Sequence, residues 1–159
     1  MAEKLRIQRK DIYEIEVNDH GDTISFALGD VELPFRLNEA YEGISKAQEW
    51  LKQRLTVINK QKDSKIKDSA MTRNQKLSME AQKECFAKMR TAMDRFLGEG
   101  GCQKIFGDVN YFEMYNDLFD ALNEKGEDGL SHLERMKISN DAISARVMEK
   151  YGSAENQVI

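Results

Sequence analysis

Glycines crowd one stretch of the chain, "FLGEGGCQKIFGD" at residues 96–108, where they stand among apolar residues, a cysteine and a lysine. Glycine-rich loops bind phosphates when a strand precedes a GxxxxGK[S/T] pattern and a helix follows, because the backbone amides then surround the phosphates. Here a helical pattern precedes Gly98, and Ile105 follows Lys104 where a phosphate loop has a hydroxyl residue. The dinucleotide fingerprint lacks its strand as well. We therefore interpret residues 98–101 as a sharp corner between helices, with Gly98 at a positive, left-handed φ.

Cysteine and histidine are the other residues with obvious chemistry. The chain has two of each, at Cys85, Cys102, His20 and His132. No pair has the close spacing of metal ligands, and nothing in the pattern supports a Cys–His nucleophile. We interpret both cysteines as small apolar packing residues, His20 as part of a turn and His132 as lying on a solvated helix face. The sequence thus assigns no catalytic, cofactor-binding or metal-binding residue, and an enzyme is the least favoured class.

Aromatic and apolar residues are concentrated in "NYFEMYNDLFDALNE", residues 110–124. Asn110 and Glu113 resemble a capping box, which predicts a helix beginning there. The segment has more apolar surface than one core face uses. Two interpretations stay open: the helix is buried on two sides, or it presents aromatic side chains to a partner inside an acidic rim formed by Glu113, Asp117 and Asp120.

The first 37 residues show the period-2 alternation of β-strands. Three apolar sets, beginning at Tyr13, Ile24 and Val31, are separated by turn residues at 18–22 and 29–30. Pro34 cannot donate a ladder hydrogen bond, so the third strand should lie at an edge. We predict an antiparallel three-stranded meander at about 12–36. Helices should cover its apolar face, which includes Ile15, Ile24, Phe26 and Leu33.

The rest of the chain has helical periodicity. We predict about four helices between 38 and 150: one begins at Asn38, one runs from about 75 to 97, one follows Asn110, and one spans about 130–150. A short turn at "CQKIF" lies between them. Residues 59–74 are polar and basic, and are either the solvated end of a helix or a loop. The expected architecture is a single α+β domain over 1–151, followed by a flexible tail at 152–159.

Composition limits the location and partners of the protein. The chain has 159 residues, of which 40% are hydrophobic and 33% charged, and a formal net charge of −4. It contains no apolar run long enough to span a membrane, and its charged start does not resemble a signal peptide, so we expect a cytoplasmic protein. Residues 59–76 carry six basic and two acidic side chains, whereas 98–130 carry eight acidic and two basic ones. This asymmetry is compatible with homo-oligomers in which opposite charges meet.

Two segments resemble one family of phage proteins. "FLGEGGCQKIFGDVNYFEMYNDLFDAL" and "IYEIEVNDHGDTISFALGDVELPFRLNEAYE" are similar to tail assembly chaperones of long-tailed phages and prophages of Gram-positive bacteria, and together cover roughly half the chain. The resemblance implies a non-enzymatic protein of the host cytoplasm, absent from the mature virion. Such a protein binds the tape-measure protein and assists polymerisation of the tail-tube protein around it. The aromatic residues of the matching segment are the partner-binding candidates: Phe106, Tyr111, Phe112, Tyr115 and Phe119.

Two other functions stay open. The first alternative is a minor structural tail or connector protein of the virion, which would remain in purified particles. The second is a small DNA-binding regulator that uses the basic segment at residues 60–76. That segment has no helix-turn-helix spacing, so binding to nucleic acid is disfavoured.

Overall fold

An antiparallel hairpin opens the regular structure, as the alternation predicts. Strands β1 (Ile12–Glu16) and β2 (Thr23–Ala27) pair in a register that places Tyr13 opposite Phe26 and Ile15 opposite Ile24. The side-chain oxygen of Asn18 accepts hydrogen bonds from two backbone amides of the connecting turn. Phe26 is 2% exposed, so one face of the hairpin is covered. The computed structural model describes residues 2–8 and 11–152.

The predicted third strand at residues 31–35 is wrong. Helix α1 (Leu33–Lys60) begins inside it, and the sheet in the described part of the chain has two strands. In the turn after β2, the side chain of Asp30 accepts a hydrogen bond from the amide of Glu32, and its backbone carbonyl accepts one from the amide of Leu33. Pro34 then falls in the first turn of the helix, where a residue without an N–H leaves no hydrogen bond unmade. The same proline that suggested an edge strand is therefore suited to a helix start.

Helix α1 also begins before the predicted N-cap, Asn38, which lies inside the helix. Apolar residues recur along it at spacings of three and four: Ile44, Ala47 and Ile58 are buried, and Leu51 and Leu55 are half-buried. The helix ends at Lys60, and residues 61–72 form a loop. Of the two interpretations of the basic segment, the loop is confirmed for this part.

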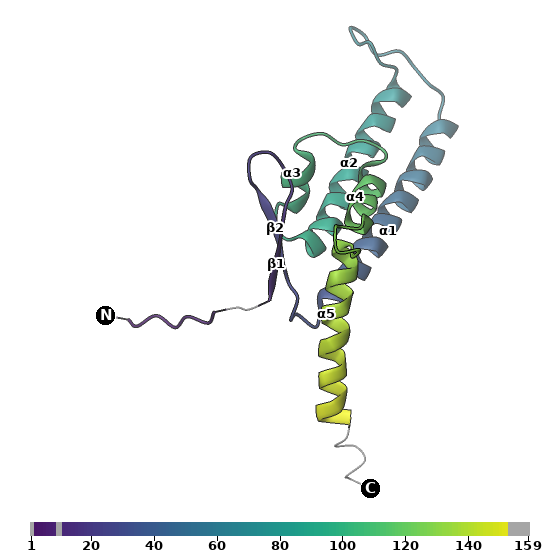
Figure 1. Ribbon diagram of the computed structural model, residues 1–159. Coiled ribbons are helices and arrows are strands. Elements are labelled where there is room, and N and C mark those ends of the chain that lie inside the picture. Colours follow the sequence, from purple (N-terminus) through teal and green to yellow (C-terminus); the bar gives the residue numbers. More distant parts are fainter. Residues whose placement is uncertain (1, 9–10, 153–159) are drawn as a thin grey trace. The chain divides into compact units, whose positions relative to one another are not determined.

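Helix α2 (Arg73–Leu97) follows the loop and begins with a capping box. Thr72 accepts a hydrogen bond from the amide of Gln75, whose side chain accepts one from the amide of Thr72. This arrangement places the helix start two residues before the predicted one. Figure 1 shows α1 and α2 running side by side, joined by the loop.

Contacts along α1 and α2 show that the two helices are antiparallel. Glu39 is ion-paired with Arg95, and the Cys85 thiol donates to the carbonyl of Ala47 at 3.4 Å. Residue numbers therefore increase along α1 in the direction in which they decrease along α2. Between residues 40 and 102, the buried apolar residues are Ala40, Ile44, Ala47, Ile58, Ala81, Cys85, Met89, Ala92, Met93, Phe96, Leu97 and Cys102.

The glycine-rich stretch is a corner, as predicted. Gly98 ends α2 with a positive φ of 92°, but its ψ of 165° lies outside the left-handed helical region that the sequence suggested. Gly100, with φ 72° and ψ 9°, is the residue in that region. Helix α3 (Gly101–Phe106) is the predicted short turn, and Asp94 holds its start by accepting a 2.8 Å hydrogen bond from the amide of Cys102.

The remaining helices are α4 (Met114–Asn123) and α5 (His132–Val147), which continues as a π-helical turn at Met148–Gly152. Ser131 caps α5 by accepting from the amide of Glu134. His132 does not lie on a solvated face as expected: it is half-buried, and its Nδ1 shares a hydrogen bond with the hydroxyl of Tyr13 on β1. This contact places α5 against the hairpin.

The chain forms two compact units. One contains residues 1–34 and 111–159, with the hairpin, α4 and α5, and the other contains residues 35–110, with nearly all of α1 and with α2 and α3. The protein is thus mostly helical with a small antiparallel sheet, as the α+β prediction states in its coarser form. The single domain over 1–151 stays a prediction. The predicted flexible tail lies, from residue 153 on, outside the described residues.

Candidate polypeptide-binding site

The five aromatic candidates do not share one environment. Phe106 ends α3 in the unit of residues 35–110, where it is half-buried, and the other four belong to the other unit. Tyr115 is 6% exposed and Phe119 is half-buried, both within α4. Tyr111 and Phe112 precede α4 and are exposed, Phe112 to 89%. The structure therefore leaves Tyr111 and Phe112 as the two candidates with accessible rings.

Phe112 is exposed because α4 begins later than the sequence predicts. The capping box at Asn110 and Glu113 is wrong: the side-chain oxygen of Asn110 accepts a 2.7 Å hydrogen bond from Nε of Arg90. Glu113 instead occupies the N-cap position, and a turn closed by the Met114 amide on the Tyr111 carbonyl leads into the helix. Phe112 lies in this turn, before the helical face that becomes buried.

The buried face of α4 contains Met114, Tyr115, Leu118 and Leu122. It is the face that the spacing of three and four predicts. Of the two interpretations of the aromatic segment, burial therefore holds for Tyr115. It does not hold for Phe112, which no part of the described chain covers.

Acidic residues follow the exposed pair in the chain. Glu113 accepts a 2.8 Å hydrogen bond from the side-chain amide of Asn116, and Asp117 and Asp120 are exposed one and two turns into α4. Desolvation and then a hydrogen bond to the Asp117 carboxylate raise the pKa of the Tyr111 hydroxyl. An exposed aromatic ring with an acidic rim can bind an apolar side chain whose neighbours are basic.

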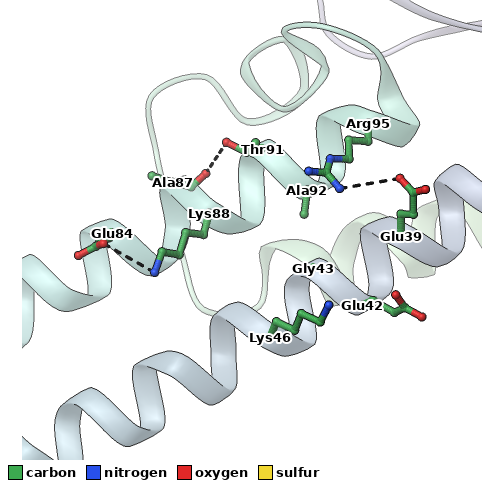
Figure 2. A pocket seen from close by; sticks show the side chains of 10 residues that line it. All are labelled: Glu39, Glu42, Gly43, Lys46, Glu84, Ala87, Lys88, Thr91, Ala92 and Arg95. Carbon is green, nitrogen blue, oxygen red and sulfur yellow. Dashed lines mark hydrogen bonds and ion pairs between the residues drawn. The ribbon is translucent and has the colours of Figure 1, made fainter.

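A groove runs between α1 and α2 in the other unit, with a volume of about 560 Å³ (Figure 2). Its small residues, Gly43 and Ala92, lie where the two helices approach each other. The charged residues around them are Glu39, Glu42, Lys46, Glu84, Lys88 and Arg95. Glu39 pairs with Arg95 and Glu84 with Lys88, so much of this charge is compensated within the groove. This groove was not predicted, although two small residues four apart in the sequence, Gly43 and Ala47, are a signal of close helix packing.

The basic loop borders a second hollow, of about 670 Å³, whose lining includes Met71, Met79 and several amide side chains. Asp63 accepts hydrogen bonds from the amides of Ser64 and Asn74, which ties the loop to the start of α2. These bonds, with the one to Asn74 the largest cause, lower the pKa of Asp63. The segment that the DNA-binding alternative requires is thus a loop between two helix ends and not a recognition helix.

The cysteines are packing residues, as the sequence indicates. Both are buried and neither forms a disulfide, and burial raises the pKa of the Cys85 thiol despite the nearby Lys88 ammonium group. A raised pKa disfavours the thiolate that nucleophilic chemistry requires. Among residues 2–8 and 11–152, His, Cys, Asp and Glu side chains form no group of three or more that could hold a metal ion.

Comparisons of the chain with protein-family models, with curated proteins and with solved structures gave no match. Over the described part of the chain, no helix combines the length and the apolar character needed to cross a membrane.

Proposed function

We propose that this protein is a non-enzymatic tail assembly chaperone of a long-tailed phage, which binds the tape-measure protein in the host cytoplasm. The supporting observation is the exposure of Phe112, 89%, at the acidic entrance to α4. This residue lies in the segment that resembles such chaperones. Covering such an exposed phenylalanine ring with a partner would contribute about 1.5–3 kcal/mol.

Phe112 supplies the apolar anchor of the contact, with Tyr111 beside it. Buried aromatic anchors contribute most of the binding free energy at such interfaces, while surrounding charges mainly set specificity and association rate. Glu113 and Asp117 therefore favour partner segments with lysine or arginine next to an apolar residue. The proposal further includes transient contact with the tail-tube protein, self-association, and absence from the mature virion.

The experiment is co-expression with the tape-measure protein encoded by the same phage. The parent protein should increase the soluble fraction of that chain, and Phe112→Ala should weaken binding by about 2 kcal/mol while leaving the Tm nearly unchanged. Phe35→Ala is the matched control, because it removes the same atoms from a ring that is 70% exposed in the other unit.

Two results would redirect the proposal. If the tape-measure protein is equally soluble with and without this protein, the chaperone function is wrong. If the protein is found in purified phage particles, the function as a minor structural tail or connector protein takes its place.

A further inference from the structure

Among the residues that the structure describes, no strand pairs with one edge of β1. The amide of Leu28 donates to the carbonyl of Asp11 and the amide of Val17 to that of Asp22, both at 2.9 Å. Residues of an antiparallel strand alternate between bonding to one neighbour and to the other. Ile12, Glu14 and Glu16 therefore direct their N–H and C=O groups away from β2, and within residues 2–8 and 11–152 no backbone group bonds to them there. Such an edge is a template for another strand.

The segment at residues 2–8 has the pattern of a strand but is not in the sheet. Basic Lys4 and Arg6 alternate with Leu5 and Ile7. Every residue of the segment is exposed, Leu5 to 90% and Ile7 to 81%. Exposure of two neighbouring apolar side chains to water is unfavourable, so a state in which they are covered is favoured.

One antiparallel register matches this segment to the free edge in both charge and polarity. Its pairs are Lys4–Glu16, Leu5–Ile15, Arg6–Glu14 and Ile7–Tyr13. The charged pairs lie on the solvent face, where Glu14 and Glu16 are exposed. The apolar pairs lie on the face that contains buried Phe26. A shift by one residue would put Leu5 and Ile7 in water and the basic residues on the apolar face, so the pattern selects this register.

We propose that the free edge of β1 is a strand-docking site, and that its occupant is the chain's own residues 4–8. Residues 9–11 join the two segments in sequence, and so short a connection gives an effective concentration in the millimolar range. Asp11 has a φ of 66°, the left-handed conformation found at the last position of three-residue hairpin loops. Docking creates a three-stranded sheet whose third strand lies on the opposite edge from the one the sequence suggested. The undocked state leaves the edge open to other extended segments. This inference is independent of the proposed chaperone function.

A disulfide trap tests both the register and the occupant. Leu5 and Ile15 would form a non-hydrogen-bonded pair, in which the Cα atoms are about 4.5 Å apart and a disulfide can form. The double variant Leu5→Cys/Ile15→Cys should oxidise readily to a disulfide within one chain. The native residues Cys85 and Cys102 are buried, so they are not replaced in either variant. Lys4→Cys/Ile15→Cys is the matched control, since its two side chains would lie on opposite faces, and it should form little disulfide.

Three results of this trap would overturn the proposal. A disulfide-linked dimer would make a second copy the occupant. Equal oxidation of both cysteine pairs would mean that residues 4–8 lie near β1 without one fixed register. No oxidation of either pair would mean that residues 4–8 do not reach the edge.

Hydrogen exchange measured by NMR gives a second test without cysteine substitutions. In the docked state, the amides of Glu14 and Glu16 bond to residues 4–8, and Arg6→Pro removes a donor from the pairing strand. Exchange of these amides should accelerate roughly tenfold in Arg6→Pro, but not in Ala2→Pro outside the pairing. The amides of Tyr13 and Ile15 face β2 and should be unaffected. Unchanged exchange at Glu14 and Glu16 in Arg6→Pro would contradict docking.

Discussion

Gly43 on α1 lies directly against Ala92 on α2: a Cβ at position 43 would be 2.4 Å from the Cβ of Ala92. Non-bonded carbon atoms do not approach so closely in folded proteins, because their optimal separation is about 3.5–4.0 Å. The glycine is therefore required for packing at this position, although it disfavours the helix locally.

Gly43→Ala should destabilise the protein. Alanine improves helix propensity by up to about 1 kcal/mol, but overpacking of a helix interface costs about 1–3 kcal/mol, so the net effect should be a loss. Urea unfolding of the variant measures it. Ala92→Gly added to Gly43→Ala removes the opposing Cβ, and the double variant should recover part of the loss. If Gly43→Ala is more stable than the parent, the helices are not packed this closely.

Gly98 and Gly100 should respond differently to asparagine. The φ of 92° and ψ of 165° at Gly98 lie in a region that is essentially confined to glycine, whereas Gly100 is in the left-handed helical region, which asparagine tolerates. A Cβ at either position meets no atom within 4 Å, so the comparison isolates backbone strain. Gly98→Asn should cost about 1–3 kcal/mol, and Gly100→Asn less than about 1 kcal/mol. Equal losses in thermal unfolding would contradict the assigned corner geometry.

Phe26→Ala should lower the free energy of unfolding by about 3–5 kcal/mol, because it empties a buried site on the covered face of the hairpin. Phe35→Ala makes the same change at an exposed ring and should remain within about 0.5 kcal/mol of the parent. Chemical denaturation of the two variants gives the comparison. If Phe26→Ala melts like the parent, the hairpin is not packed on the helices.

Asp63 should make the stability of the loop end of α2 depend on pH. Hydrogen bonds from the Asn74 amide, the Thr72 side chain and the Ser64 amide lower its pKa from the ordinary value of 3.8. A lowered pKa in the folded state means that the carboxylate stabilises the fold above 3.8, and that this contribution is lost as the pH falls through the lower folded value.

The measurement for Asp63 is the Tm of the parent and of Asp63→Asn as a function of pH. The parent should be more stable near neutral pH, and the difference should shrink once the pH is below 3.8. Asp68→Asn removes the same charge from the same loop and controls for net charge. A Tm difference that is constant with pH would show that the charge of Asp63 does not stabilise these hydrogen bonds.

Much of the local structure could be predicted from the sequence, because it depends on residues close together in the chain. Alternation at Tyr13, Ile15, Ile24 and Phe26 indicates the hairpin, and spacing of three and four indicates the long helices. Gly98 indicates the end of α2 because tolerance of a positive φ is a property of the glycine itself and needs no contact with a distant residue. These features follow from side-chain period and backbone sterics alone.

The predictions that failed depend on contacts between distant residues. Residues 31–35 alternate like a strand, but a strand needs a partner and a helix needs only its own backbone, so Pro34 became part of a helix start. Asn110 has the side chain of an N-cap, yet its oxygen accepts a hydrogen bond from Arg90, twenty residues earlier.

The candidate site shows the same division. Tyr115 and Phe112 are both aromatic residues of one short segment, and their sequence context marks both as apolar surface to be covered. Only the tertiary structure separates them, because α4 begins at Met114 and turns Tyr115 toward the core while Phe112 stays in the preceding turn. Side-chain type determines how much a residue gains from burial. Which residue is buried is decided by the helix boundary and by the packing of segments far apart in the chain.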